Sequence, residues 1–279
     1  MSYLAFLTSK LTLHTLGAVI VTLVTWTSGI FIVMALCERA GGASLARYRS
    51  REVLHDLFYR IFYSSGLFRV LLLLPVAIFL SRWLAVPQLA NLAAAPLVLA
   101  VPVSLIVSDC CAYWTHRFQH SRWWWPFHRV HHSQTNLTFL TTYRHHPLDM
   151  LLEEGVSLIL VVIGAPTFTW LPYRLLSTFQ AAASHAELNW SYGPVGRLFV
   201  SPVFHSIHHA EDRAEHDRNF GALLSIWDRI WGTSSARNVR PAATGVAGYV
   251  APDSWAMQLA EPIIEIVRPG RDTRNRRDA

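Results

Sequence analysis

Three features of the sequence predict an all-α, integral-membrane helical bundle with a histidine-rich cap. Hydrophobic residues make up 52% of the 279 residues and charged residues only 15%, whereas soluble domains average about 25% charged residues. Long uncharged apolar runs alternate with polar segments. Eleven of the 14 histidines lie between positions 116 and 209. We therefore expect about three membrane spans and a helical hairpin, with the histidines in a metal-binding cap.

Three stretches are long enough to span a bilayer, which requires about 20 mainly apolar residues. They cover residues 11–37, 67–86 and 88–108. The first is too long for the core of a typical signal peptide, and no small-x-small cleavage site follows it, so we interpret it as a retained span. A fourth apolar region, residues 155–184, is interrupted by prolines and predicts a hairpin.

These elements form one predicted domain, residues 1–240. Its cap consists of the polar segments 109–150 and 185–233. Residues 241–279 are expected to form a C-terminal tail, which ends in five arginines and is mobile at its end.

Arginines between the first two predicted spans set the expected orientation, because cytoplasmic loops carry an excess of basic residues. This loop contains Arg39, Arg47, Arg49, Arg51 and Arg60. The N-terminus then lies outside, and both histidine-rich segments and the C-terminus lie on the cytoplasmic side. The net charge of +6 fits a membrane surface, and no nucleic-acid partner is expected.

The histidines are spaced for helical faces in three places. His116 and His120 are four residues apart, so a helix would place both on one face. Two further clusters share the spacing i, i+3, i+4: His128, His131 and His132, and His205, His208 and His209. Each cluster follows a proline suited to the first turn of a helix. With His145, His146 and His185 nearby, the set is too large for one metal ion and about right for two.

These segments resemble the fatty acid hydroxylase/sterol desaturase superfamily of integral-membrane di-iron oxygenases. The resemblance covers residues 109–233 and is carried by His116-Arg-Phe-Gln-His120, His128-Arg-Val-His-His132, Arg144-His-His-Pro147, Ser184-His185, His205-Ser-Ile-His-His209 and Trp231-Gly-Thr233. The last motif departs slightly from the more usual Phe-Gly-Thr. Within the superfamily, the sequence is most similar to bacterial sterol desaturase-like proteins and to alkylglycerol monooxygenase.

The resemblance implies two iron ions as cofactors and O₂ as co-substrate. The ligands it implies are His116, His120, His128, His131, His132, His146, His185, His205, His208 and His209. His146 is chosen over His145 because the family's histidine directly precedes the proline. Because imidazole does not choose sharply between iron and zinc, a recombinant preparation could hold zinc.

Polar residues near the histidines are expected to orient the rings through their second nitrogen. Asp109 is the strongest candidate. It lies seven residues before His116, on the same helical face, and an acidic residue at the end of an apolar span needs a partner. The other candidates are Asp149, Glu187, Asn189, Asn219 and Asp228.

The expected reaction is O₂-dependent hydroxylation, or desaturation, of a lipid or sterol-like alkyl chain, with ether-lipid cleavage as an alternative. The sequence has no Gly-x-Gly-x-x-Gly fingerprint and no cysteine-rich iron–sulfur spacing. Electrons are therefore expected from an external donor, which the resemblance implies is a cytochrome b5-like protein, a ferredoxin or a pterin.

Three alternatives from other classes remain open: a zinc-dependent hydrolase, a haem electron carrier and a metal-binding transporter. Catalytic zinc generally has three protein ligands, fewer than this sequence offers. Haem ligands in a membrane bundle would lie inside the spans, whereas these histidines lie beyond them. A transporter would need polar groups at the bilayer midplane, and the predicted spans are nearly free of them.

Overall fold

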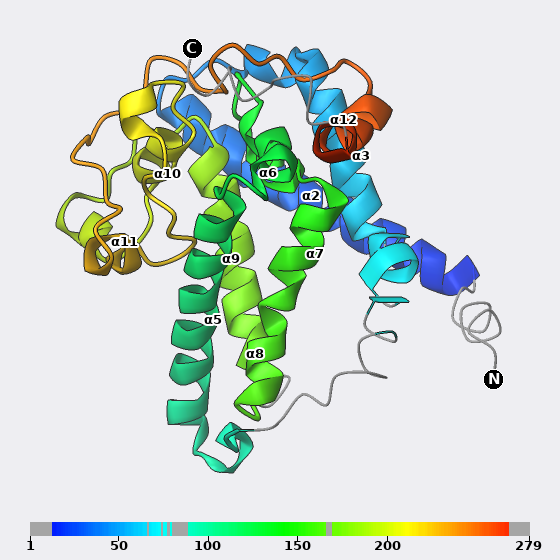
Figure 1. Cartoon of the computed structure of the whole chain (residues 1–279), viewed down its shortest axis with the longest axis vertical. Helices are drawn as coiled ribbons and strands as arrows, with labels where there is room; N and C mark the ends of the chain where they lie inside the picture. The colour runs from blue at the N-terminus through cyan, green and yellow to red at the C-terminus, as the bar shows by residue number, and fades with distance from the viewer. Residues whose placement is uncertain are drawn as a thin grey trace.

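Helices dominate the computed structural model, which describes residues 13–65, 67–73, 75–76, 79, 89–165 and 169–267. The all-α prediction is confirmed, because within these ranges β structure is limited to two isolated bridges, Phe199–Leu224 and Ala210–Thr244. Figure 1 shows a helical bundle in the lower half of the molecule, with the remaining helices gathered above it.

The bundle is built from α5 (Leu97–Gln119), α7 (Pro147–Gly155), α8 (Ser157–Val162) and α9 (Trp170–His185). Among the described residues, α5 is the one helix that is long and apolar enough to cross a membrane. α7 and α8 descend along α5 and α9 returns beside it (Figure 1). The cap end of the bundle therefore carries the last turns of α5 and α9 and the first turn of α7.

The helix that corresponds to the third predicted span begins and ends later than predicted. Residues 88–108 were expected to form it, but the helix begins at Leu97, after Pro96, and continues to Gln119. The preceding segment instead closes the end of the hairpin. The amide of Leu89 donates to the carbonyl of Val162 at 2.7 Å, and the amide of Leu92 to that of Ile163 at 3.0 Å.

The hairpin also turns earlier than expected. The two arms were predicted to meet near residue 174, whereas α8 ends at Val162 and α9 begins at Trp170. Gly164 has a φ of +62°, a conformation that glycine adopts without steric cost, so the chain leaves the helix there. The first predicted span corresponds to α2 (Leu13–Ala40). Most of the second, residues 67–86, lies outside the described residues.

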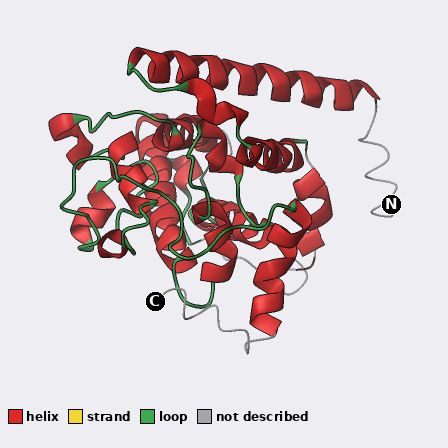
Figure 2. Ribbon diagram, turned by 90° about the horizontal axis from the view of Figure 1, so that it is seen from above, coloured by secondary structure: helices red, strands yellow, loops and turns green. Residues whose placement is uncertain are grey.

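The cap packs on the upper end of the bundle. Its helices are α3 (Arg51–Ser64), α6 (Trp125–His132), α10 (Pro202–His208) and α11 (Ile226–Ile230), with shorter turns η1 (Leu45–Arg49), η4 (Phe139–Tyr143), η6 (Gly193–Arg197) and η7 (Arg213–Glu215). α2 lies along one edge of the molecule (Figure 2). Its Met34 is buried in one core cluster with Phe139 of η4 and Ala182 and Ala183 of α9. This cluster ties α2 and η4 to α9.

The predicted C-terminal tail contains a helix, α12 (Trp255–Val267). It is anchored on the cap. Arg129 of α6 pairs with Glu265 at 2.7 Å, and the Tyr59 hydroxyl donates to Gln258 Oε1 at 3.2 Å. The arginine-rich end of the tail lies outside the described residues.

Candidate metal centre

Three helix ends bring most of the histidines together. His116 lies in the last turn of α5, and His120 is its C-cap residue. α6 carries His128, His131 and His132, and α10 carries His205 and His208, with His209 as its C-cap. Ser201 is the N-cap of α10, because its Oγ accepts from the Phe204 amide at 3.1 Å. The sequence spacing therefore produces imidazole faces on short, capped helices.

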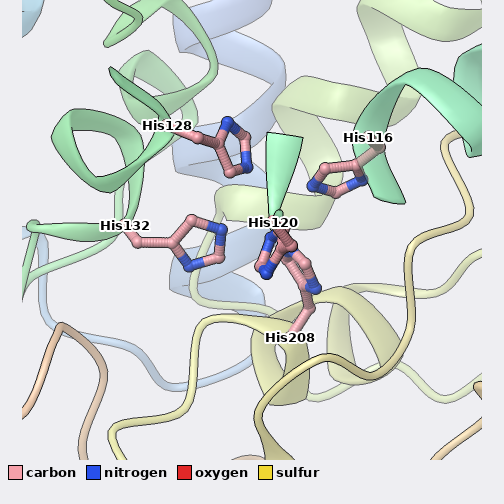
Figure 3. Close-up of side chains that lie close together, drawn as sticks. All are labelled: His116, His120, His128, His132 and His208. Atoms are coloured by element: carbon pink, nitrogen blue, oxygen red, sulfur yellow. The ribbon is translucent and has the colours of Figure 1, made fainter. Parts of the chain in front are cut away.

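Five histidines form a first group whose ligand atoms all lie within 4.8 Å of one another. These are His116, His120, His128, His132 and His208. Figure 3 shows their rings gathered around a common space. They come from α5, α6 and α10, so the group forms only when the cap is folded.

In the first group, oxygen atoms fix the orientation of the rings. The Nδ1 atom of His116 lies 2.8 Å from the Phe220 carbonyl, and that of His208 lies 2.7 Å from the Arg218 carbonyl. A carbonyl can only accept, so these Nδ1 atoms carry the hydrogen and each Nε2 presents a lone pair. The buried Nε2 atoms of His128, His132 and His208 have no hydrogen-bond partner among the described residues.

A second group consists of His131, His185, His205 and His209, all buried. Nε2 of His185 lies 3.3 Å from Nε2 of His131 and 3.1 Å from Nε2 of His205. Nε2 of His205 lies 3.2 Å from Nε2 of His209. The Nδ1 atom of His185 donates to the Ala181 carbonyl at 2.7 Å, so its Nε2 is an acceptor facing two other ring nitrogens.

Both groups fit a bound metal ion. Nitrogen atoms held about 2.1 Å from one ion lie roughly 3 to 3.4 Å apart, as the Nε2 pairs of the second group do. Burial lowers the pKa of His208 to about 3 and, with neighbouring imidazoles adding to the effect, takes the pKa values of His131, His132, His205 and His209 well below 6.5. Neutral imidazole is the form that binds metals.

His146, a predicted ligand, lies outside both histidine groups in this structure. His146 is the N-cap of α7, where its Nδ1 accepts from the Leu148 amide at 3.2 Å. Its Nε2 contacts the Leu259 carbonyl of α12 at 3.0 Å. Both ring nitrogens are thus engaged away from the two groups. His145 instead stacks on His131, with ring centroids 4.3 Å apart.

Asp149 is the acidic residue in closest contact with the histidines. Its Oδ2 atom lies 2.9 Å from Nδ1 of His128 and 3.0 Å from Nδ1 of His145. Its Oδ1 atom accepts from Gln119 Nε2 and from Trp124 Nε1, each at 2.9 Å. The carboxylate therefore orients two imidazoles and is itself held in place. Gln119 and Trp124 were not predicted from the sequence, because nothing in their spacing points to Asp149.

Asp109 and Asp228 act on a loop rather than directly on a ring. Asp109 accepts from the amides of Leu223 and Leu224, both at 3.0 Å, and from Trp227 Nε1 at 2.8 Å. Asp228 accepts from the amides of Phe220 and Gly221 at 2.7 and 2.8 Å. Together they hold the loop whose Phe220 carbonyl meets His116. Asp109 was expected to contact a histidine. Its carboxylate oxygens instead accept hydrogen bonds from Leu223, Leu224 and Trp227.

The remaining predicted orienting residues divide into two kinds. Asn219 donates from Nδ2 to the Phe204 carbonyl at 2.8 Å and so supports α10. Glu187 pairs with Arg47 and Arg240 instead of a histidine, because the chain leaves α9 at Ala186 and turns toward α2. Asn189 is exposed. Asp217, which the sequence did not reveal, lies 3.2 Å from Nδ1 of His120.

A cavity of about 300 Å³ opens beside the histidines. It lies between α5, α7–α8 and α9 and is lined at one end by His116, His131, His185 and His205. A small molecule in this cavity would therefore touch residues of both histidine groups.

Known proteins resemble this chain in sequence. Residues 101–233 match the family model of fatty acid hydroxylase. The chain is 32% identical over 171 residues to an ornithine lipid hydroxylase of Rhizobium tropici, covering 60% of this chain and 51% of that protein.

Two further relatives also oxidise lipids, according to their names. The chain is 30% identical over 129 residues to alkylglycerol monooxygenase of Homo sapiens, covering 45% of this chain and 28% of that protein. It is 27% identical over 133 residues to a methylsterol monooxygenase of Arabidopsis thaliana, covering 46% and 49%. The chain thus spans about half the length of these relatives, or less. No solved structure matches it.

Proposed function

We propose, from the membership of residues 101–233 in the fatty acid hydroxylase family, that this protein is a membrane oxygenase that hydroxylates a lipid. The observation that carries the proposal is the pair of histidine groups, whose ring nitrogens converge beside one cavity. The names of the relatives, which include hydroxylases and monooxygenases of three lipid classes, support the reaction type.

The proposed reaction takes a C–H bond, O₂, two electrons and two protons to C–OH and water. Two iron ions would supply the redox and O₂ chemistry when bound. The first would be held by His116, His120, His128, His132 and His208, and the second by His131, His185, His205 and His209. Asp149 and the loop carbonyls keep the Nε2 atoms directed inward, and burial excludes bulk water.

The electrons would come from an external donor, a cytochrome b5-like protein, a ferredoxin or a pterin. We also propose that α5 crosses the membrane, with the histidine cap and the C-terminus on the cytoplasmic side and the N-terminus outside. The exposed Val98, Leu99 and Ile106 of α5 favour a lipid environment for this helix, and the arginines between α2 and α3 favour the cytoplasm for the cap end.

Incubation of the iron-loaded protein with lipids, reductant and ¹⁸O₂ tests the proposal. The expected product carries one ¹⁸O atom in a new hydroxyl group. A double bond without ¹⁸O would indicate desaturation. An aldehyde released from an ether lipid would indicate ether cleavage, the reaction that the similarity to alkylglycerol monooxygenase favours second. Failure to oxidise any lipid, in protein with a full metal complement, would contradict the proposal.

A further inference from the structure

The cavity beside the histidines contains three charged side chains that the oxygenase reaction does not require. Glu153 and Glu154 of α7 face it from one side, and Arg174 of α9 faces it from another. The other lining residues in this section include apolar ones, among them Met150 and Leu160. An otherwise lipid-suited cavity thus has a charged section close to the proposed metal site.

The contacts of these three residues leave an excess of negative charge. Arg174 Nη2 lies 3.3 Å from Glu154 Oε1, so these two form an ion pair. Glu153 Oε1 accepts from Gln119 Nε2 at 3.1 Å and lies 3.4 Å from Nδ1 of His145. Both of these contacts use Oε1. Glu153 Oε2 has no hydrogen bond to another described residue and is therefore available to a ligand.

A purely hydrocarbon substrate would not suit this section. Filling the cavity with an alkyl chain would remove water from the Glu153 and Glu154 carboxylates and offer them no new partner, which is costly. Ionisable groups within a membrane bundle are expensive and usually pair with a substrate or with each other. A ligand that brings its own charges would offset this cost.

One end of the charged section, at Glu153, lies beside the histidines. Glu153 contacts His145, and His145 stacks on His131 of the second group. Arg174 lies eleven residues before His185 on α9, an axial distance of about 16 Å. Because Glu154 is next to Glu153 and pairs with Arg174, all three charges lie within reach of one headgroup. The cavity volume is at the lower end of the range for ligand pockets, which leaves little room for a long chain as well.

We propose that Glu153, Glu154 and Arg174 bind the zwitterionic headgroup of the lipid substrate. The ammonium group is held by the two carboxylates, and the carboxylate or phosphate of the same head is held by Arg174. This inference rests on the proposed lipid oxygenase function and adds to it the substrate class. It also places the oxidised carbon in or next to the headgroup, because Glu153 lies beside the histidines.

Three lipids of matched chain length separate the possibilities. They are an N-acylated diamino acid lipid with a free amine and carboxylate, a phosphatidylethanolamine, and an uncharged alkylglycerol. We expect at least one zwitterionic lipid to be oxidised with a kcat/KM about tenfold or more above that of the alkylglycerol. A ratio of this size corresponds to the loss of one charged contact in the alkylglycerol complex. The zwitterionic lipid that is oxidised faster shows whether Arg174 binds a carboxylate or a phosphate. Equal or faster oxidation of the alkylglycerol would overturn the inference while leaving the oxygenase function standing.

Equilibrium binding of the same lipids to the full chain in detergent provides a readout that does not depend on turnover. Glu153→Gln and Arg174→Gln are each expected to weaken binding of the preferred zwitterion about tenfold, with little effect on the alkylglycerol. Arg174→Lys, which keeps the charge, should retain more affinity than Arg174→Gln. Metal content measured on each variant shows whether the histidine site is intact.

Arg237→Gln is the matched control, because it removes an ion pair of similar length, 3.5 Å to Asp212, outside the cavity. It should bind all three lipids like the parent protein. If Glu153→Gln and Arg174→Gln keep their metal and bind the zwitterion as the parent does, the headgroup site is wrong. If no lipid is oxidised but the zwitterion binds and the variants weaken it, the headgroup site stands and the oxygenase function fails.

Discussion

Five imidazoles in and beside the two histidine groups are oriented by the oxygen atom that their Nδ1 contacts. Carbonyls of Phe220, Ala181 and Arg218 receive three of these contacts, and the carboxylate of Asp149 receives two. The remaining Nε2 atoms converge on two points. This arrangement is expected of metal ligands, whose second nitrogen almost always donates to a carboxylate or carbonyl.

His146 provides the first test at this scale. It caps α7 and contacts α12 but faces neither histidine group. His146→Ala should therefore leave the metal content unchanged and lower the free energy of unfolding by about 1 kcal/mol, the usual cost of losing a helix cap. Elemental analysis and chemical unfolding measure both. Loss of metal from this variant would restore His146 to the ligand set.

The variant Asp149→Asn provides the second test at the residue scale. The Asp149 carboxylate accepts from four donors through two oxygens, whereas an amide turns an NH₂ group toward one pair of them. Either His128 and His145, or Gln119 and Trp124, therefore lose their acceptor. Loss of such an acceptor typically costs 10- to 100-fold in metal affinity, and competition with a chelator should show a reduction in this range. Asp212→Asn, on the surface, is the control. Equal affinity of the parent and Asp149→Asn would show that the carboxylate does not support the site.

The sequence predicted the histidines well because their spacing is a local property of a helix. Nine of the ten predicted ligands fall into the two groups. The tenth, His146, caps α7 and contacts α12, and this role depends on packing that its spacing does not reveal. Glu187 was assigned from its proximity to His185, but its partners, Arg47 and Arg240, are far away in the sequence.

At the scale of elements, the loop between α10 and α11 connects the bundle to the metal site. Asp228 of α11 holds Phe220 and Gly221 of this loop, and Asp109 of α5 holds Leu223 and Leu224 near its end. A Cβ at Gly221 would come within 2.6 Å of the Leu224 carbonyl. The close approach explains why glycine is needed in this loop.

Gly221→Ala should therefore shift the loop and the Phe220 carbonyl that His116 contacts. We expect a loss of about 1 to 3 kcal/mol in stability, as for other overpacked sites, together with weaker binding of one metal ion. Gly155→Ala is the control, because a Cβ at this position meets nothing within 4 Å. A parent-like thermal midpoint and metal content for Gly221→Ala would contradict the role assigned to this loop.

Element boundaries were harder to predict than element types. Residues 88–108 are uninterrupted by charge, so composition could not show that residues 89–93 contact the end of α8 instead of forming part of the helix. α12 was missed for a related reason. It contains Pro262, and its order depends on contacts with Arg129 and Tyr59 that are distant in sequence.

For the whole molecule, burying neutral imidazoles makes stability depend on pH. An unfolded histidine titrates near pH 6.5, whereas the pKa of His208 is lowered to about 3 by burial. Below pH 6.5 the unfolded chain takes up more protons than the folded chain, so stability falls as the pH falls.

Metal-free protein should lose about 1 kcal/mol per buried histidine per pH unit below 6.5, measured by chemical unfolding at pH 7.5, 6.5 and 5.5. Bound metal should add to the stability at each pH until protons displace it. A metal-free protein equally stable at pH 7.5 and 5.5 would show that the histidines are not buried in the neutral form.

The most direct test of the two-metal site is the metal content of single-group variants. Protein purified anaerobically with iron should hold about two ions per chain and show no Soret absorption. His208→Ala, in the first group, and His131→Ala, in the second, should each retain about one ion, and the double variant none. A haem spectrum, or two ions retained in either single variant, would contradict the site described here.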